Sequence, residues 1–147
     1  MNKRKSVLVT SGSKRLGKHI SKFFVMNDWD LILHYNNSKV EAEETANELS
    51  LYSKNIKLYQ ADFTNHKDVK NLVENLLLKE KDWIGLVNNA GLFEYDTGQE
   101  FTIEKLNHHM SINFSTPAIL IQALYKNIIK NQVVKNKNNM VINIIDA

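Results

Sequence analysis

Short apolar runs alternate with amphipathic segments along this chain, and the alternation predicts strands and helices in turn. Five apolar runs are expected to be strands: Ser6–Thr10, Leu31–Tyr35, Ile56–Gln60, Ile84–Gly91, which runs on into a loop, and Met140–Ile145. Runs that are apolar at nearly every position are typical of strands covered on both faces. We therefore expect a parallel sheet between two layers of helices.

Segments with apolar residues three and four positions apart separate these runs and are expected to be helices. The apolar positions are Leu16, Ile20, Phe23 and Phe24 after the first strand, Ala42, Ala46, Leu49 and Tyr52 after the second, and Val69, Leu72, Val73, Leu76 and Leu77 after the third. Asn65, with Asp68 three residues later, marks the start of the third helix. Thr102 to about Asn131 is expected to be one long helix, which Pro117 would kink or start again.

The order of these elements predicts one α/β domain over residues 1–147. Strands joined by helical crossovers run parallel and carry helices on both faces, as in a doubly wound, Rossmann-like sheet. In such a sheet ligands bind at the carboxyl ends of the strands, where the strand order reverses. The loops that follow the strands are therefore the places to look for chemistry.

Composition narrows the classes of partner. The 147 residues carry a net charge of only +3, with lysines scattered along the chain, so we expect no nucleic-acid binding. The absence of cysteine excludes disulfides, thiolate zinc sites and a cysteine nucleophile. No apolar run approaches membrane-spanning length, and a cytoplasmic protein without a membrane partner is expected. His108 and His109 are adjacent and point about 100° apart on a helix, so no metal site is expected.

The stretch "VTSGSKRLG", Val9–Gly17, connects the first expected strand to the first helix. Backbone N–H groups at a helix N-terminus attract phosphate, and glycine lets the backbone approach a ligand closely. Gly12 and Gly17 are present, and Lys14 and Arg15 between them add positive charge. A plain surface loop can have the same composition, so the turn alone leaves both interpretations open.

The end of the second strand bears on which nucleotide such a turn would take. Folds that prefer NAD place an acid near this strand end, where it bonds the ribose hydroxyls. The sequence from His34 to Val40 contains no acid. A neutral polar end and a basic first turn favour the 2′-phosphate of NADP, although an ordinary strand-end loop would read the same way.

Four motifs together resemble the short-chain dehydrogenase/reductase family. They are "VTSGSKRLG" at 9–17, "ADF" at 61–63, "NNAG" at 88–91 and "SINFSTP" at 111–117, and they occur in family order and at family spacing. The resemblance covers the whole chain and about the first three-fifths of the family's usual fold. It implies NADPH as the cofactor and hydride transfer as the reaction.

Within the family, the chain is most similar to the pteridine reductases. Arg15-Leu16-Gly17 stands where other members have glycine-x-glycine, and His34, Tyr35 and Ser38 match a "HY…S" strand end. Asp146 stands where other members have the catalytic serine, and Phe93 is placed to stack on a pterin ring. The implied substrate is a pterin or dihydrofolate. The alternative is a 3-oxoacyl-carrier-protein reductase of the same family, but Asp146 and Phe93 both favour the pteridine reductases.

The resemblance also assigns roles to individual positions. Ser11, Arg15 and Leu16 would line the pyrophosphate and nicotinamide, while His34, Tyr35, Asn36 and Ser38 would surround the 2′-phosphate. Asp62 and Phe63 would flank the adenine, and Asn89, Ala90 and Gly91 would line the ribose. At the reacting end, Arg15 and Phe93 would reach the substrate. Asn113 would help to hold a proton-relay water, and Asp146 would act in acid/base chemistry.

Three departures from the family pattern qualify these roles. Ser11 replaces a glycine, which strains the turn by about 1–3 kcal/mol if φ is positive there, unless the turn reshapes around Gly12. Asn37 replaces an arginine of the pteridine reductases. In the family, the catalytic Tyr-x-x-x-Lys motif lies beyond the fifth strand. A match to this motif, from Tyr35 to Lys39, falls in the adenosine region and is not expected to be catalytic. We therefore expect part of an enzyme, oligomeric if its fold is complete, or a remnant that only binds nucleotide.

Overall fold

The computed structural model describes residues 5–53, 55–95, 97–131 and 139–145. Helices and strands alternate in the expected order. The elements are β1 (Lys5–Val9), α1 (Arg15–Met26), β2 (Trp29–Tyr35), α2 (Lys39–Leu49), β3 (Ile56–Gln60), α3 (His66–Lys79), β4 (Trp83–Asn88), α4 (Ile103–Met110), the π-helix η1 (Ser111–Ser115), α5 (Thr116–Lys130) and β5 (Met140–Asn143). Asn65 caps α3 as predicted, because its side chain accepts a hydrogen bond from the Lys67 N–H.

The sheet has five parallel strands in the order β3-β2-β1-β4-β5, so the predicted fold class is confirmed. The chain adds β2 and β3 on one side of β1 and then crosses over to add β4 and β5 on the other side. This change of direction is the switch point of a doubly wound sheet. The loops after β1 and β4 therefore face each other across the crevice where such sheets bind ligands.

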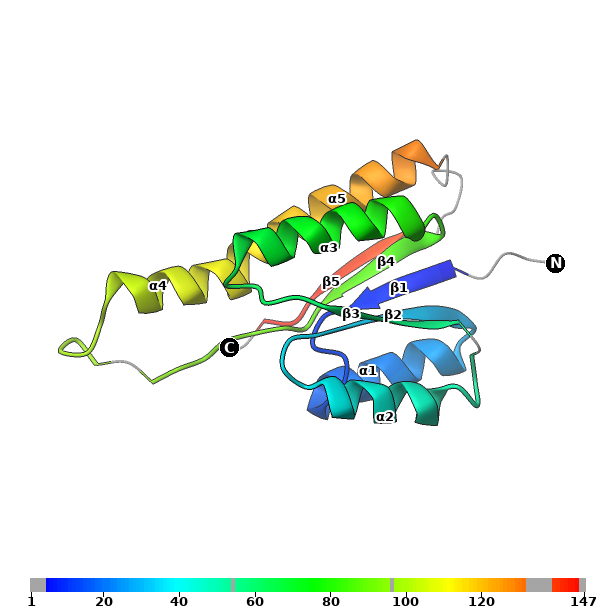
Figure 1. Cartoon of the computed structure of the whole chain (residues 1–147), viewed down its shortest axis with the longest axis horizontal. Coiled ribbons are helices and arrows are strands. Elements are labelled where there is room, and N and C mark those ends of the chain that lie inside the picture. Colours follow the sequence, from blue (N-terminus) through cyan, green and yellow to red (C-terminus); the bar gives the residue numbers. More distant parts are fainter. Residues whose placement is uncertain (1–4, 54, 96, 132–138, 146–147) are drawn as a thin grey trace.

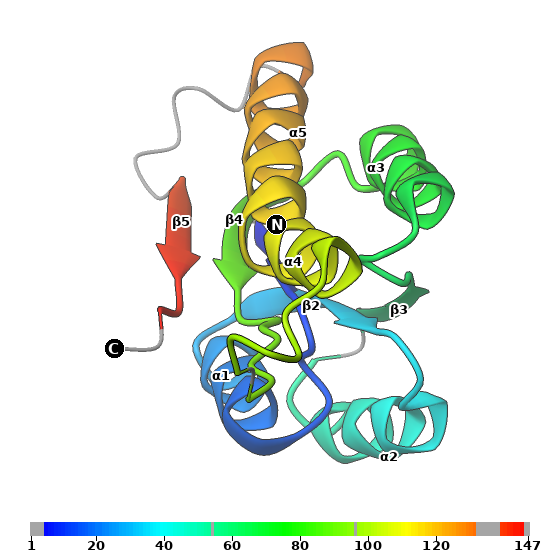
Figure 2. The ribbon, with the colours of Figure 1, turned by 90° about the vertical axis from the view of Figure 1, so that its left-hand side faces the viewer.

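Helices cover both faces of the sheet. In Figure 1, α1 and α2 lie below it and α3 and α5 lie above it, and the end-on view in Figure 2 shows the same layers. Val7 and Val9 of β1 belong to the core on the α1–α2 side, whereas Leu8 belongs to the core on the α3–α5 side. Alternate residues of one strand thus bury opposite faces, as the pleat requires. Trp29 and Trp83 are both buried, as expected of core residues.

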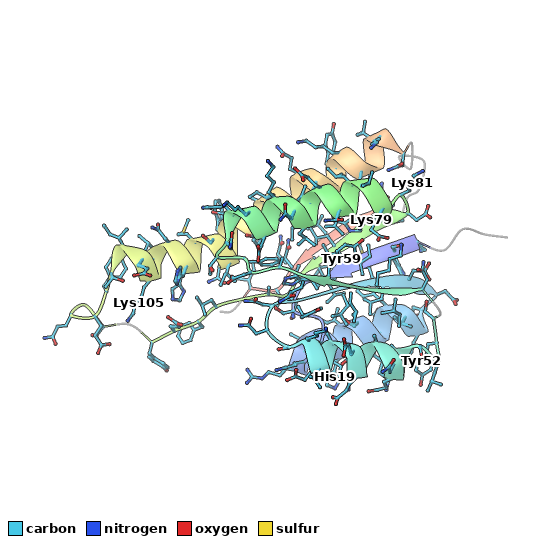
Figure 3. All side chains as sticks on the ribbon, viewed as in Figure 1. His19, Tyr52, Tyr59, Lys79, Lys81 and Lys105 are labelled. Atoms are coloured by element: carbon cyan, nitrogen blue, oxygen red, sulfur yellow. The ribbon has the colours of Figure 1, made fainter. Side chains whose placement is uncertain are left out.

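The long helix expected from Thr102 to Asn131 is continuous but not uniformly α-helical. Residues 111–115 form a π-helical segment between α4 and α5, and Pro117, in the first turn of α5, has no N–H to donate to the preceding turn. Figure 3 shows Lys105 on α4, projecting beyond the sheet, with Lys79 and Lys81 at the opposite end of the molecule. Within the described ranges, no helix combines the length and apolarity needed to span a bilayer.

Candidate functional site

The turn between β1 and α1 has its carbonyl groups tied to the surrounding structure. Four consecutive carbonyl oxygens accept hydrogen bonds from side chains of other elements. The bonds run from Asn89 Nδ2 to Thr10 O (3.0 Å) and Ser11 O (3.2 Å), from Ser21 Oγ to Gly12 O (3.0 Å), and from Thr45 Oγ1 to Ser13 O (3.0 Å). The helix that follows has no side-chain cap at its N-terminus. Its first N–H groups are therefore donors for an anion.

Two residues of this turn have left-handed backbone conformations. Ser11 has φ of 50° and Arg15 has φ of 48°, whereas φ is negative at Gly12 and Gly17. Ser11 and Arg15 occupy the positions where the family pattern has glycine. The turn therefore keeps the glycine conformation with larger residues in it and does not reshape around Gly12. Backbone strain of this kind costs about 1–3 kcal/mol per residue.

Gly17 is required by space and not by φ. A Cβ atom on Gly17 would lie 2.1 Å from the carbonyl oxygen of Ser11 and 2.7 Å from Nδ2 of Asn89. The first turn of α1 therefore packs directly on the backbone of the preceding loop. This close approach fixes the helix N-terminus beside the end of β4.

His34, at the end of β2, holds the turn through a hydrogen bond to Ser11. Its Nδ1 accepts a hydrogen bond from the Ser11 N–H (3.1 Å), so Nε2 carries the proton and donates to the Ala61 carbonyl oxygen (3.0 Å). The ring stacks on Phe63 with centroids 4.1 Å apart, and only 2% of the residue is exposed. Burial disfavours the charged imidazolium and lowers the pKa of His34 to about 4. His34 is therefore neutral at physiological pH and holds Ser11 in its strained conformation.

Burial separates the residues that the resemblance placed around the 2′-phosphate. The residues His34 and Tyr35 are buried in the sheet, with 2% and 8% of their surface exposed. Asn36 and Ser38 lie half-buried in the loop that leads to α2. Only this second pair has side chains at the surface next to the strand end. His34 supports the turn, and contact of His34, Tyr35, Asn36 or Ser38 with a 2′-phosphate stays a prediction.

The residues expected at the adenine show a similar division. Phe63 is buried with its ring against His34, whereas Asp62 is half-buried. One carboxylate oxygen of Asp62 accepts hydrogen bonds from the N–H (2.8 Å) and the hydroxyl (2.7 Å) of Thr64. The carboxylate is therefore held in place by the loop after β3. Contact of either residue with adenine stays a prediction.

The loop after β4 is joined to the turn after β1. The hydroxyl of Thr10 accepts hydrogen bonds from the N–H groups of Asn89 (2.9 Å) and Ala90 (2.8 Å). Together with the Asn89 side chain described above, these bonds bring the "NNAG" motif against "VTSGSKRLG". Gly91 follows at the exposed edge of this contact. Motifs far apart in the sequence thus meet at the switch point of the sheet.

Asn113 fastens the next part of this loop to the π-helix. Its Oδ1 accepts from the Leu92 N–H (2.8 Å) and its Nδ2 donates to the Leu92 carbonyl oxygen (2.8 Å). Asn113 is the middle residue of η1, a type of segment often found at functional sites. Phe93 is 71% exposed, with its ring edge-on to Tyr95 at 5.4 Å. Asp146 lies outside the described residues.

Sequence reasoning missed an ion pair beside the turn. The ammonium of Lys14 pairs with the carboxylate of Glu41 in the first turn of α2, and this contact lowers the pKa of Glu41. Glu41 follows directly after the stretch from His34 to Val40, which contains no acid. By contrast, the exposed side chain of Arg15 has no hydrogen bond or ion pair with any residue that the structure describes.

A cavity of about 620 Å³ lies beside this site, between the start of α3 and α4. Thr64, His66, Asn107, His108 and Ser111 are among its lining residues. Over the described ranges, no group of three or more histidine, aspartate or glutamate side chains is arranged to hold a metal ion. The paired histidines at 108 and 109 thus do not form part of such a group.

Comparison with known proteins gives a family match over almost the whole chain. Residues 5–145 match the family model described as short chain dehydrogenase. The curated protein "Short-chain dehydrogenase/reductase FrzI" from Cladobotryum sp is 26% identical over 119 residues, which are 81% of this chain and 46% of that protein. The chain spans about half the length of curated relatives that it matches.

Two solved structures with bound nucleotide superpose well on this chain. FolM Alternative dihydrofolate reductase 1 from Brucella canis, complexed with NADP, is 30% identical with a TM-score of 0.80, and the match covers 97% of this chain and 55% of that one. A short-chain dehydrogenase from Sphingobium yanoikuyae in complex with NADPH is 24% identical with a TM-score of 0.80, and the match covers 95% and 52%.

Proposed function

Because the chain belongs to the short-chain dehydrogenase family, we propose that the turn between β1 and α1 binds the diphosphate of NADP(H). The observation that carries the proposal is the arrangement of this turn. The carbonyl oxygens of the turn accept hydrogen bonds from the side chains of Asn89, Ser21 and Thr45, whereas the N-terminal N–H groups of α1 have no side-chain cap. Relatives of known structure carry NADP or NADPH.

The residues at the switch point fit such a cofactor. Gly17 lets the first turn of α1 pack directly on the Ser11 carbonyl, which positions the helix N-terminus, and the exposed side chain of Arg15 is available to pair with a phosphate or a substrate. The loop of Asn89, Ala90 and Gly91 lies beside it and is available to line a ribose. The nicotinamide, when bound, supplies hydride transfer. The work of this chain is to bind and orient the reactants.

For the substrate we propose a pterin or dihydrofolate. Arg15 keeps a glycine conformation at the position that distinguishes pteridine reductases, and the 30% identical FolM structures are named alternative dihydrofolate reductases. Phe93 presents an exposed ring shortly after β4, suited to stacking on a flat heterocycle. Asn113 and Asp146 are proposed to serve the substrate end of the site.

Cofactor binding is tested by titrating NADPH into the chain and following nicotinamide fluorescence. Gly17→Ala forces the first turn of α1 away from Ser11, so we expect its affinity for NADPH to fall at least ten-fold. Gly98→Ala is the matched control, because a Cβ there meets nothing within 4 Å, and its affinity should equal that of the wild type. Absence of saturable binding by the wild-type chain would contradict the proposal.

Substrate class is tested by binding in the presence of saturating NADPH. We expect 7,8-dihydrobiopterin to bind and Phe93→Ala to weaken it several-fold through loss of one stacking surface. Phe101→Ala, which removes another exposed phenylalanine from the same connection, is the control. Binding of a 3-oxoacyl thioester in place of the pterin would contradict the pterin assignment. It would not contradict the proposed nucleotide site.

A further inference from the structure

The nucleotide turn is joined to α2 by two side chains on one face of that helix. Glu41 pairs with Lys14, and Thr45, one helical turn further on, donates its hydroxyl proton to the carbonyl oxygen of Ser13 (3.0 Å). Lys14 is the N-cap residue directly before α1, and Glu41 lies in the first turn of α2. The ammonium of Lys14 is therefore held toward the loop that follows β2.

This loop is where dinucleotide folds distinguish NAD from NADP. An acid there bonds the ribose hydroxyls, and a cation there accommodates the 2′-phosphate. In this chain both kinds of group are present and neutralise each other, because Lys14 and Glu41 are paired. Between the end of β2 and Glu41 lie the uncharged residues Asn36, Asn37 and Ser38 and one cation, Lys39, which pairs with Glu43.

We propose that Glu41 sets the cofactor preference of this site by competing with the 2′-phosphate for Lys14. The inference rests on the proposed function, since it concerns the adenosine end of the same site. A 2′-phosphate must displace the Glu41 carboxylate from Lys14 and approach a second negative charge. A ribose 2′-hydroxyl does not have to displace Glu41. Glu41 therefore lowers the affinity for NADPH more than the affinity for NADH.

The strength of the pair is suited to such a competition. Both side chains are about half exposed, and exposed ion pairs are weak, so Lys14 can exchange partners. A doubly charged phosphate forms stronger charge-assisted hydrogen bonds than a neutral hydroxyl. The other basic side chains at the α1–α2 contact, Lys18 and Lys22, pair with Glu48 instead. Glu41 is therefore the acid that faces the turn.

The test uses two fragments of the cofactor, 2′,5′-ADP and 5′-AMP, which differ only in the 2′-phosphate. Calorimetric titration measures the affinity of the full chain for 2′,5′-ADP and for 5′-AMP. We expect Glu41→Gln to raise the affinity for 2′,5′-ADP about five-fold and to change that for 5′-AMP less than two-fold. Lys14→Gln should lower 2′,5′-ADP affinity, and Glu41→Gln added to Lys14→Gln should then have no further effect.

Glu48→Gln is the matched control, because it removes the same charge from an ion pair between the same two helices, two turns further along α2. An equal gain from Glu41→Gln and Glu48→Gln would overturn the inference, since it would reflect net charge alone. Loss of 5′-AMP affinity in Glu41→Gln would also overturn it. If NADPH binds and no variant changes the ratio, the inference fails and the proposed function stands. If no nucleotide binds, both fail.

Discussion

The hydrogen bond from the Ser11 N–H to Nδ1 of His34 connects a buried strand residue to the strained position of the nucleotide turn. This bond requires a neutral imidazole, because a protonated Nδ1 has no lone pair to accept with. Burial against Phe63 keeps the ring neutral, and the bond to the Ala61 carbonyl fixes its tautomer and orientation. The shape of the turn thus depends on a side chain that itself lies outside the binding surface.

The lowered pKa of His34 predicts a pH dependence of stability. The folded chain resists protonation of His34 down to about pH 4, whereas the unfolded chain takes up the proton near 6.5. The contribution is therefore fully present above pH 6.5 and is lost as the pH falls toward 4, by about 3 kcal/mol in total. Urea unfolding at several pH values measures this loss. In His34→Asn, which does not titrate, the loss should be smaller by that amount, and parallel profiles for the two proteins would contradict the role of His34.

Ser11 and Arg15 allow backbone strain to be separated from function. Both have positive φ, so Ser11→Gly and Arg15→Gly should each raise the free energy of unfolding by about 1 kcal/mol. Only Arg15→Gly also removes an exposed guanidinium, so we expect NADPH affinity to fall in that variant and not in Ser11→Gly. Chemical denaturation and fluorescence titration measure the two effects. A fall in affinity in Ser11→Gly would show that the serine itself serves the site.

The structural roles of individual residues differ in how well they can be predicted from the sequence. Asn65 was predictable as a helix cap because the signal is local, three residues long and independent of the rest of the fold. The support from His34 could not be predicted, because it depends on a bond to a residue 23 positions away. The pairing of Glu41 with Lys14 likewise requires the packing of α2 against α1.

At the scale of elements, the π-helix decides what Asn113 can reach. Because η1 is wider than the α-helices on either side, it sets the direction in which the Asn113 side chain meets the loop after β4. Both polar atoms of that side chain bind the backbone of Leu92. One asparagine thus holds the loop that carries Phe93.

Removing this side chain should loosen the loop without unfolding the chain. We expect Asn113→Ala to cost about 1 kcal/mol or less, because the bonds are exposed, and to speed amide exchange at Leu92 at least ten-fold. Hydrogen exchange followed by NMR measures this at single residues. Asn88 and other amides of β4 serve as internal controls and should be unchanged. Unaltered exchange at Leu92 would mean that other contacts hold the loop.

The elements were predictable where periodicity is strong and less so where it changes. Alternating apolar runs gave the five strands in the right places, and β3 has the predicted bounds. The long helix was predicted as a unit, but its π-helical segment has no signature in residue type. Tyr52, expected on the apolar face of the second helix, lies beyond its end at Leu49 and is exposed.

At the scale of the whole molecule, the strand order creates the site and an open edge together. The change of direction between β1 and β4 brings the "VTSGSKRLG" and "NNAG" motifs into contact. The β5 edge of the described sheet is mostly exposed, and an apolar groove of about 330 Å³ runs between α1 and β5. Exposed apolar strand edges favour pairing with other chains.

This edge predicts self-association that depends on concentration. Sedimentation velocity should show a rising average mass for the chain, and Ile144→Lys, which places a charge in the groove, should reduce it. Leu51→Lys is the control, since Leu51 is equally apolar and more exposed but lies after α2, outside the groove. A chain that stays monomeric at every concentration would contradict this expectation.

The architecture was the most predictable level, because the order of strands and helices allows few arrangements of a parallel sheet. The motifs locate the switch point from the sequence alone. What the sequence left open was which charges meet there, since Lys14, Arg15 and Glu41 come from two helices. That depends on side-chain placement and not on topology.

Binding of NADP(H) by the turn between β1 and α1 is tested at single residues by an NMR titration. NADPH added to ¹⁵N-labelled chain should cause saturable shifts that are largest at the amides of Lys14, Arg15, Leu16 and Gly17, with smaller ones at Asn89–Gly91. The claim would be contradicted by no saturable shifts, or by shifts centred instead on the cavity of His66, Asn107 and His108 between α3 and α4.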